Sequence, residues 1–239
     1  MTLRKHIPNA ITSMNLVCGL VGVVFALRSR LDIAFYCMLA AAVCDFLDGW
    51  VARKLDAASD FGREMDSLSD LVSFGFLPAL MLCLLMQTFR FEAGWICWVP
   101  LVLTLFSGLR LAKFNTDPRQ TDQFLGLPTP AAALFCGALC CFCVNAPTAF
   151  LSTWAAGPVF IPLLALCLGL LMVTELPMFS LKCHKEDARA MVVKRWTLAG
   201  FAVVSVAFCL IFRHHLSLAV VLTMLFYILN NLVYALFKL

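Results

Sequence analysis

The feature that most constrains this sequence is a series of strongly apolar runs. Each run is close to the roughly twenty residues that a helix needs to cross the hydrocarbon core of a bilayer. The pattern predicts an all-α fold, a polytopic transmembrane helical bundle of about eight spans. We place the spans at residues 8–27, 31–52, 65–87, 93–112, 128–147, 154–174, 196–212 and 216–237.

Composition favours a membrane protein over a soluble one. Of the 239 residues, 62% are apolar and 13% are charged. A soluble domain is about half apolar and about a quarter charged. We therefore expect a single integral membrane domain that covers residues 1–239 and begins with an uncleaved span. The basic residues form no block of the kind that binds nucleic acid, so we expect no nucleic-acid partner.

The charges of the connecting loops predict the orientation in the membrane. Eight spans place both termini on the same side. Four basic residues fall on the opposite side, and the other fourteen of the eighteen fall on the side of the termini. The four are Arg28, Arg30, Arg90 and Arg213. Since cytoplasmic loops carry the excess of Lys and Arg, we expect a multi-pass protein of the cell membrane with both termini in the cytoplasm.

An acidic stretch separates two of the apolar runs on this same side. The segment DFLDGWVARKLDAASDFGREMDSLSD, residues 45–70, holds seven of the fourteen acidic residues of the chain. Charge is costly next to hydrocarbon, so such a cluster indicates a functional site. We interpret Asp56 and Asp60 as solvated loop or helix-capping residues.

The spacing of the other aspartates indicates a metal site. Asp45 and Asp48 are i, i+3, and Asp66 and Asp70 are i, i+4, so each pair shares one face of a helix. Two antiparallel helices can therefore direct four carboxylates at one point. Carboxylate oxygens are typical ligands of hard divalent ions, so we expect Mg²⁺ or Mn²⁺ as the cofactor.

Small residues and one arginine accompany these acids. Gly49 and Ala52 leave open space beside Asp48. Arg53, one turn beyond Gly49, supplies a fixed positive fork that suits a phosphate. Together with the metal-binding acids, these residues predict a site for a diphosphate.

The complete pattern is Asp45-x-x-Asp48-Gly49-x-x-Ala52-Arg53, eight residues, Gly62, three residues, Asp66, three residues and Asp70. It resembles the signature of the CDP-alcohol phosphatidyltransferase family, which implies that family's fold, a divalent metal and a CDP-linked lipid substrate. The resemblance implies that Asp45, Asp48 and Asp66 bind the metal. It implies two roles for Asp70, which are a further metal contact and the catalytic base. It implies CDP binding by Gly49, Ala52, Arg53 and Gly62. It also implies a homodimer.

The N-terminal segment IPNAITSMN places Asn9, Thr12 and Asn15 at spacings of three, so they share a helical face. Two explanations fit these residues equally. They can serve ordinary capping and helix-packing roles, or they can contact the nucleotide. The family often begins with a similar Pro-Asn-x-x-Thr element. This resemblance favours nucleotide binding for Asn9 and Thr12.

A second polar group follows the fourth run, in the segments RLAKFN and GLPTPAA. Arg110, Lys113 and Asn115 are either flanking charges at the membrane surface or a site for an anion, namely a lipid phosphate or an acceptor carboxylate. With DSLSDLVSFG, these segments resemble the family members that use L-serine. The resemblance implies transfer of the phosphatidyl group from CDP-diacylglycerol to serine, with release of CMP. The family often has Arg where this chain has Lys113.

Three alternatives remain. The acceptor could be glycerol 3-phosphate or inositol phosphate, because Arg110 and Lys113 do not decide between anions. The chain could be an ion or metal transporter, since carboxylates within the membrane also mark ion pathways. The clustering of the acids at one face and the absence of a visible inverted repeat in the sequence weigh against a transporter. An inactive structural protein has no evident need for all four aspartates.

Overall fold

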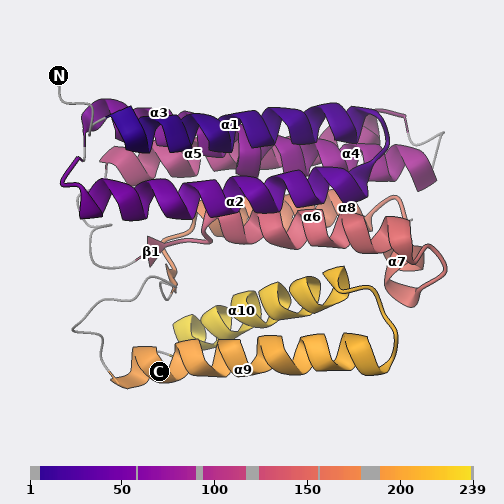
Figure 1. The fold of residues 1–239 in the computed structure, drawn as a ribbon. Helices are drawn as coiled ribbons and strands as arrows, with labels where there is room; N and C mark the ends of the chain where they lie inside the picture. Colours follow the sequence, from indigo (N-terminus) through magenta and orange to yellow (C-terminus); the bar gives the residue numbers. More distant parts are fainter. Residues whose placement is uncertain are drawn as a thin grey trace.

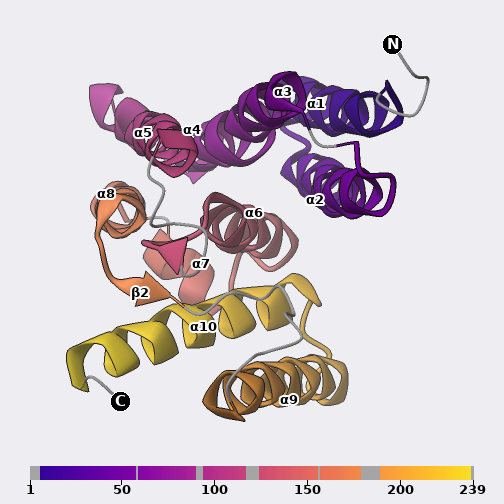
Figure 2. The same cartoon turned by 90° about the vertical axis from the view of Figure 1, so that its left-hand side faces the viewer.

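The computed structural model in Figure 1 describes residues 6–57, 59–89, 94–116, 124–155, 157–178 and 189–237. A long antiparallel hairpin begins the fold. It pairs α1 (His6–Leu27) with α2 (Leu31–Lys54) through a tight turn in which Ser29 has a φ of 59°. The next helical stretch, Asp60–Phe89, consists of α3 (Asp60–Asp70), the π-helix η2 (Leu71–Phe76) and α4 (Leu77–Phe89). The 3₁₀-helix η3 (Gly94–Leu101) and α5 (Val102–Thr116) complete this layer, which Figure 2 shows end on.

A second layer contains α6 (Thr129–Asn145), α7 (Phe150–Ala155) and α8 (Phe160–Val173). The two-residue strands β1 (Phe124–Leu125) and β2 (Pro177–Met178) pair antiparallel at its edge. The last two helices, α9 (Arg189–Ile211) and α10 (Ser217–Phe237), form a hairpin beyond the second layer, and α10 packs on α6.

Helix α6 occupies the middle of the bundle and is its most deeply buried element. Thirteen of its seventeen residues are buried. A Cβ at Gly137 would collide with Met38 of α2 and lie 2.9 Å from Phe35, so this glycine allows α2 and α6 to approach closely. By contrast, large apolar side chains such as Val24 on α1 and Val203 on α9 are exposed. A soluble protein buries such faces, whereas lipid solvates them.

The predicted helical class is confirmed in the described residues. Four helical stretches are long and apolar enough to cross a membrane: His6–Leu27, Asp60–Phe89, Gly94–Thr116 and Ser217–Tyr234. Three shorter apolar helices accompany them, at Thr129–Asn145, Phe160–Val173 and Arg195–Ile211. These apolar helices identify a membrane protein.

The structure differs from the prediction at the sixth span, which we expected at residues 154–174. Helix α7 ends at Ala155, and α8 begins only at Phe160. Gly157 and Pro158 lie between the two helices. Proline cannot donate a backbone hydrogen bond and glycine weakens a helix, so this pair interrupts what hydropathy alone shows as one run.

The π-helix directly after Asp70 is a second feature that the apolar pattern did not specify. Pro78 has no N–H to offer the carbonyl of Phe74 four residues earlier, and the π-helical turn precedes it. Single π-helical turns inside α-helices often lie at functional sites. Here the turn separates the polar helix α3 from helix α4, which is apolar up to Met86.

Candidate active site

Three aspartates converge between the C-terminal half of α2, which carries Asp45 and Asp48, and helix α3, which carries Asp66. Oxygens of Asp45, Asp48 and Asp66 all lie within 4.8 Å of one another. Asp48 is 5% exposed, and the other two are partly buried. Helix α1 packs against both α2 and α3 and holds the two helices together. Three carboxylates this close and this shielded suit a hard divalent cation, which would offset their mutual repulsion.

The fourth predicted aspartate, Asp70, lies one turn beyond Asp66 on α3 and is 8% exposed. It is not part of the group of three oxygens described above. Its Oδ1 accepts a hydrogen bond of 3.1 Å from Nδ2 of Asn15 on α1. The structure therefore gives Asp70 surroundings that differ from those of the other three carboxylates.

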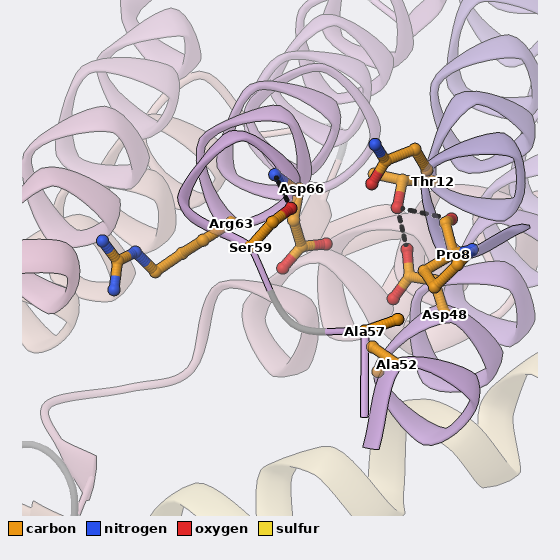
Figure 3. A pocket seen from close by; sticks show the side chains of 11 residues that line it. Pro8, Thr12, Asp48, Ala52, Ala57, Ser59, Arg63 and Asp66 are labelled. Carbon is orange, nitrogen blue, oxygen red and sulfur yellow. Dashed lines mark hydrogen bonds between the residues drawn. The ribbon is translucent and has the colours of Figure 1, made fainter. Parts of the chain in front are cut away.

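Thr12 on α1 binds one of the clustered carboxylates directly. Its hydroxyl lies 2.7 Å from Oδ2 of Asp48 and 3.1 Å from the carbonyl of Pro8 (Figure 3). Thr12 is 3% exposed, so water does not compete for these bonds. The family resemblance favours nucleotide binding for Thr12, and the structure gives its hydroxyl a contact with a candidate metal ligand.

A pocket of about 190 Å³ opens between α1, α2 and α3. Figure 3 shows the carboxylates of Asp48 and Asp66 on opposite sides of it. The lining residues are Pro8, Asn9, Thr12, Asp48, Gly49, Ala52, Ala57, Ser59, Gly62, Arg63 and Asp66. Seven of the predicted site residues are therefore brought together at one cavity. They are Asn9, Thr12, Asp48, Gly49, Ala52, Gly62 and Asp66.

Gly62 shows why the wall of the pocket needs a small residue. A Cβ there would lie 3.1 Å from both Oδ1 of Asn9 and Oγ of Ser59. Its N–H donates to Oγ of Ser59 at 3.1 Å, which makes Ser59 the N-cap of α3. Asp60, which we interpreted as a loop or capping residue, is instead the first residue of the helix.

Two arginines lie near the pocket. Arg53 is exposed and does not line it, although its Nη1 is 3.4 Å from the position of a Cβ at Gly49. Arg63 does line the pocket, but its guanidinium points away from the aspartates in Figure 3 and pairs with Asp60 at 3.0 Å. Arg63, Ala57 and Ser59 also line the pocket and were not predicted from the sequence, whereas Pro8 begins the recognised Pro-Asn-x-x-Thr element. Of the three, Ser59 had a recognisable signal, as a capping residue before a polar helix.

The three predicted anion-binding residues on α5 have different surroundings. Arg110 is 6% exposed, and its Nη1 donates to Oγ1 of Thr129 at 2.9 Å. Its Nε has no hydrogen-bond partner among the described residues, and α5 packs against the π-helix that directly follows Asp70. Lys113 pairs with Glu175 at 3.1 Å, and Nδ2 of Asn115 donates to Oγ of Ser67 at 2.9 Å. Only Arg110 is therefore buried beside the acidic site.

The fold and this site define a helical membrane protein with a carboxylate cluster beside a pocket. Comparison with known families then gives the particular family, since residues 5–171 match CDP-alcohol phosphatidyltransferase. The match covers well over half of the chain. The chain therefore belongs to the CDP-alcohol phosphatidyltransferase family, and the resemblance in its signature is confirmed.

Three relatives are named CDP-diacylglycerol–serine O-phosphatidyltransferase. The Methanocaldococcus jannaschii protein is 32% identical over 181 residues, which are 73% of this chain and 75% of the relative. The Bacillus subtilis protein is 37% identical over 131 residues, 54% of this chain and 72% of the relative. The Mycobacterium tuberculosis protein is 40% identical over 135 residues, 54% of this chain and 46% of the relative. The chain thus spans about half the length of the mycobacterial relatives that it matches.

Proposed function

We propose that this chain transfers the phosphatidyl group of CDP-diacylglycerol to the hydroxyl of L-serine, giving phosphatidylserine and CMP. The observation on which the proposal mainly rests is the convergence of Asp45, Asp48 and Asp66 beside the separately held Asp70. The names of the three relatives support serine as the acceptor. The glycerol 3-phosphate and inositol phosphate alternatives have no comparable support.

The pocket between α1, α2 and α3 would receive the CDP group. Asn9 and Thr12 line it from α1, where they can contact the nucleotide. Gly49, Ala52 and Gly62 would allow the diphosphate to approach the backbone closely. Arg53, whose guanidinium lies over Gly49, would rotate inward from its exposed position to bind a phosphate oxygen.

Asp45, Asp48 and Asp66 would hold a divalent ion, Mg²⁺ or Mn²⁺, with Asp70 as a possible further contact. Their close oxygens and partial burial fit such an ion. When bound, the ion would neutralise the diphosphate and stabilise the CMP leaving group. The Thr12 hydroxyl would fix the orientation of Asp48 by its hydrogen bond.

Asp70 would act as the base. The serine oxygen would attack the β-phosphorus, its proton would pass to Asp70, and the bond from that phosphorus to the bridging oxygen would break to release CMP. Arg110 is buried near Asp70 with its Nε available, so it would bind the serine carboxylate. Lys113 and Asn115 would support this side of the site through their contacts with Glu175 and Ser67.

We further propose one membrane domain of eight spans, with both termini and the acidic site in the cytoplasm, where a nucleotide-linked substrate is available. The support is the distribution of basic residues between the loops and the roughly aligned axes of α1, α2, α6 and α8 in Figure 1. Acyl chains would lie among membrane lipids beside the site. A homodimer is proposed from the family resemblance alone.

The function is tested with purified protein in detergent, CDP-diacylglycerol, and Mg²⁺ or Mn²⁺. CMP release is followed with serine, glycerol 3-phosphate, inositol phosphate or no acceptor. We expect release with serine only, and its loss on chelation. Release with a different acceptor only would refute serine as the substrate. No release from folded protein with any acceptor would favour the transporter or structural alternatives.

A further inference from the structure

Asn15 on α1 is a buried polar residue for which the sequence left capping, helix packing and nucleotide contact open, and to which the proposed chemistry assigns no role. Its side chain is fully buried. Nδ2 donates to Oδ1 of Asp70 at 3.1 Å, across the interface between α1 and α3. We propose that Asn15 is a positioning residue that fixes the carboxylate of Asp70 for proton transfer. This inference rests on the proposed function of Asp70.

The direction of the hydrogen bond is set by chemistry. An amide nitrogen only donates, so Oδ1 of Asp70 must accept, and the bond is strongest when the carboxylate is ionised. The contact therefore engages one lone pair of Oδ1 and fixes the plane of the carboxylate, with Oδ2 outside this bond and able to receive a proton. Because Asn15 belongs to α1 and Asp70 to α3, this restraint is independent of the helix that carries Asp70.

The backbone of Asn15 is also fixed. Its carbonyl accepts from Oγ of Ser73 at 3.1 Å, within the π-helical turn that follows Asp70. One turn further along α1, a Cβ at Gly19 would collide with the Ser73 hydroxyl. Helix α1 is thus in close contact with the π-helix immediately beyond Asn15. The approach of Gly19 to Cα of Ser73 supports the amide even without the Ser73 hydroxyl.

A purely structural role for Asn15 fits less well. Its Oδ1 is buried and has no hydrogen-bond partner among the described residues. A buried acceptor without a partner destabilises the fold, so an apolar residue would pack here at less cost if packing were the only requirement. The amide is explained by the donor that it presents to Asp70.

Thr12, three residues earlier on the same face of α1, makes the parallel contact with Asp48. One face of α1 therefore restrains two carboxylates, one within the group of three and one outside it. If the roles of the carboxylates differ, the two restraints have different consequences. Loss of the Thr12 contact would affect metal binding, whereas loss of the Asn15 contact would affect turnover.

The test compares Asn15→Leu and Asn15→Ala with the matched control Ser73→Ala. The control removes a buried hydrogen bond from the same helix interface without touching an aspartate. For each protein we would measure kcat and KM for serine and CDP-diacylglycerol, Mn²⁺ affinity by electron paramagnetic resonance, and thermal stability in detergent. Asn15→Ala provides a smaller replacement if the leucine variant does not fold.

We expect both Asn15 variants to lose about 10- to 100-fold in kcat, with both KM values and the Mn²⁺ affinity within about twofold of wild type. Ser73→Ala should keep its kcat. An equal fall in kcat for Ser73→Ala, an unchanged kcat in the Asn15 variants, or a parallel loss of Mn²⁺ affinity would overturn the proposal. A wild-type protein without serine-dependent CMP release would instead refute the proposed function. Failure of the Asn15 proposal and failure of the proposed function therefore give different results.

Discussion

Replacement of Thr12 by valine removes one hydroxyl from the acidic site and keeps nearly the same side-chain shape. The lost contact is the 2.7 Å hydrogen bond to Oδ2 of Asp48. Both residues are shielded from water, with Thr12 3% and Asp48 5% exposed. After the substitution, Asp48 keeps its charge and its burial but loses a donor that fixes its rotamer.

The magnitude follows from this geometry. A hydrogen bond to a charged partner contributes about 1.5–3 kcal/mol. The single hydroxyl proton of Thr12 is shared with the carbonyl of Pro8 at 3.1 Å, which favours the lower end of that range. Since ~1.4 kcal/mol corresponds to a factor of ten, we expect the Mn²⁺ affinity to fall about tenfold, within the range known for partners of metal ligands.

The assay is a Mn²⁺ titration of serine-dependent CMP release, with direct Mn²⁺ binding measured in parallel. Both midpoints should rise about tenfold in Thr12→Val, and saturating Mn²⁺ should restore most of the rate. The control is Ser13→Ala, which removes a neighbouring hydroxyl whose hydrogen bond within the described part of the chain goes to the carbonyl of Asn9, at 2.8 Å. An unchanged Mn²⁺ midpoint in Thr12→Val, or an equal shift in Ser13→Ala, would refute the reasoning.

Three further predictions concern other parts of the structure. Gly19→Ala should destabilise the protein by about 1–3 kcal/mol and lower its thermal midpoint, because the added Cβ would lie 3.0 Å from Cα of Ser73. An unchanged midpoint would contradict the close packing of these two helices. Arg110→Lys should raise KM for serine about tenfold in the CMP-release assay, since lysine keeps the charge but lacks the planar guanidinium that binds a carboxylate through two hydrogen bonds. An unchanged KM would show that Arg110 does not bind the acceptor. Lys113→Ala should change stability by less than about 1 kcal/mol in thermal unfolding, because its ion pair with Glu175 is partly exposed; a larger loss would mean that the pair is structurally important.

The convergence of Asp45, Asp48 and Asp66 could be predicted from the sequence because the information is local. Asp45 and Asp48 share one helix, and Asp66 and Asp70 share the next, so helical spacing alone places each pair on one face. A single short connection joins the two helices, which leaves few ways to arrange them. The helical class was equally accessible, since apolar runs in lipid can satisfy their backbone only as helices or closed barrels.

Contacts that depend on tertiary packing were not accessible in this way. Thr12 and Asn15 were recognised as polar residues on one face of α1, but their partners lie thirty-six and fifty-five residues away. Lys113 and Glu175 are sixty-two residues apart, and no pattern in the sequence connects them. The break before α8 was not predicted, because Gly157 and Pro158 lie within a long apolar stretch. A prediction of spans from hydropathy gives little weight to the backbone preferences of single residues.

The most direct test of the account is Mn²⁺ binding measured by electron paramagnetic resonance in wild type, Asp66→Asn and Asp70→Asn, beside CMP release from the same preparations. In the proposed mechanism, Asp66 holds the metal and Asp70 serves mainly in proton transfer. We therefore expect Asp66→Asn to lose both Mn²⁺ binding and CMP release, whereas Asp70→Asn should bind Mn²⁺ but release no CMP. Tight Mn²⁺ binding by Asp66→Asn, or normal CMP release by Asp70→Asn, would contradict it.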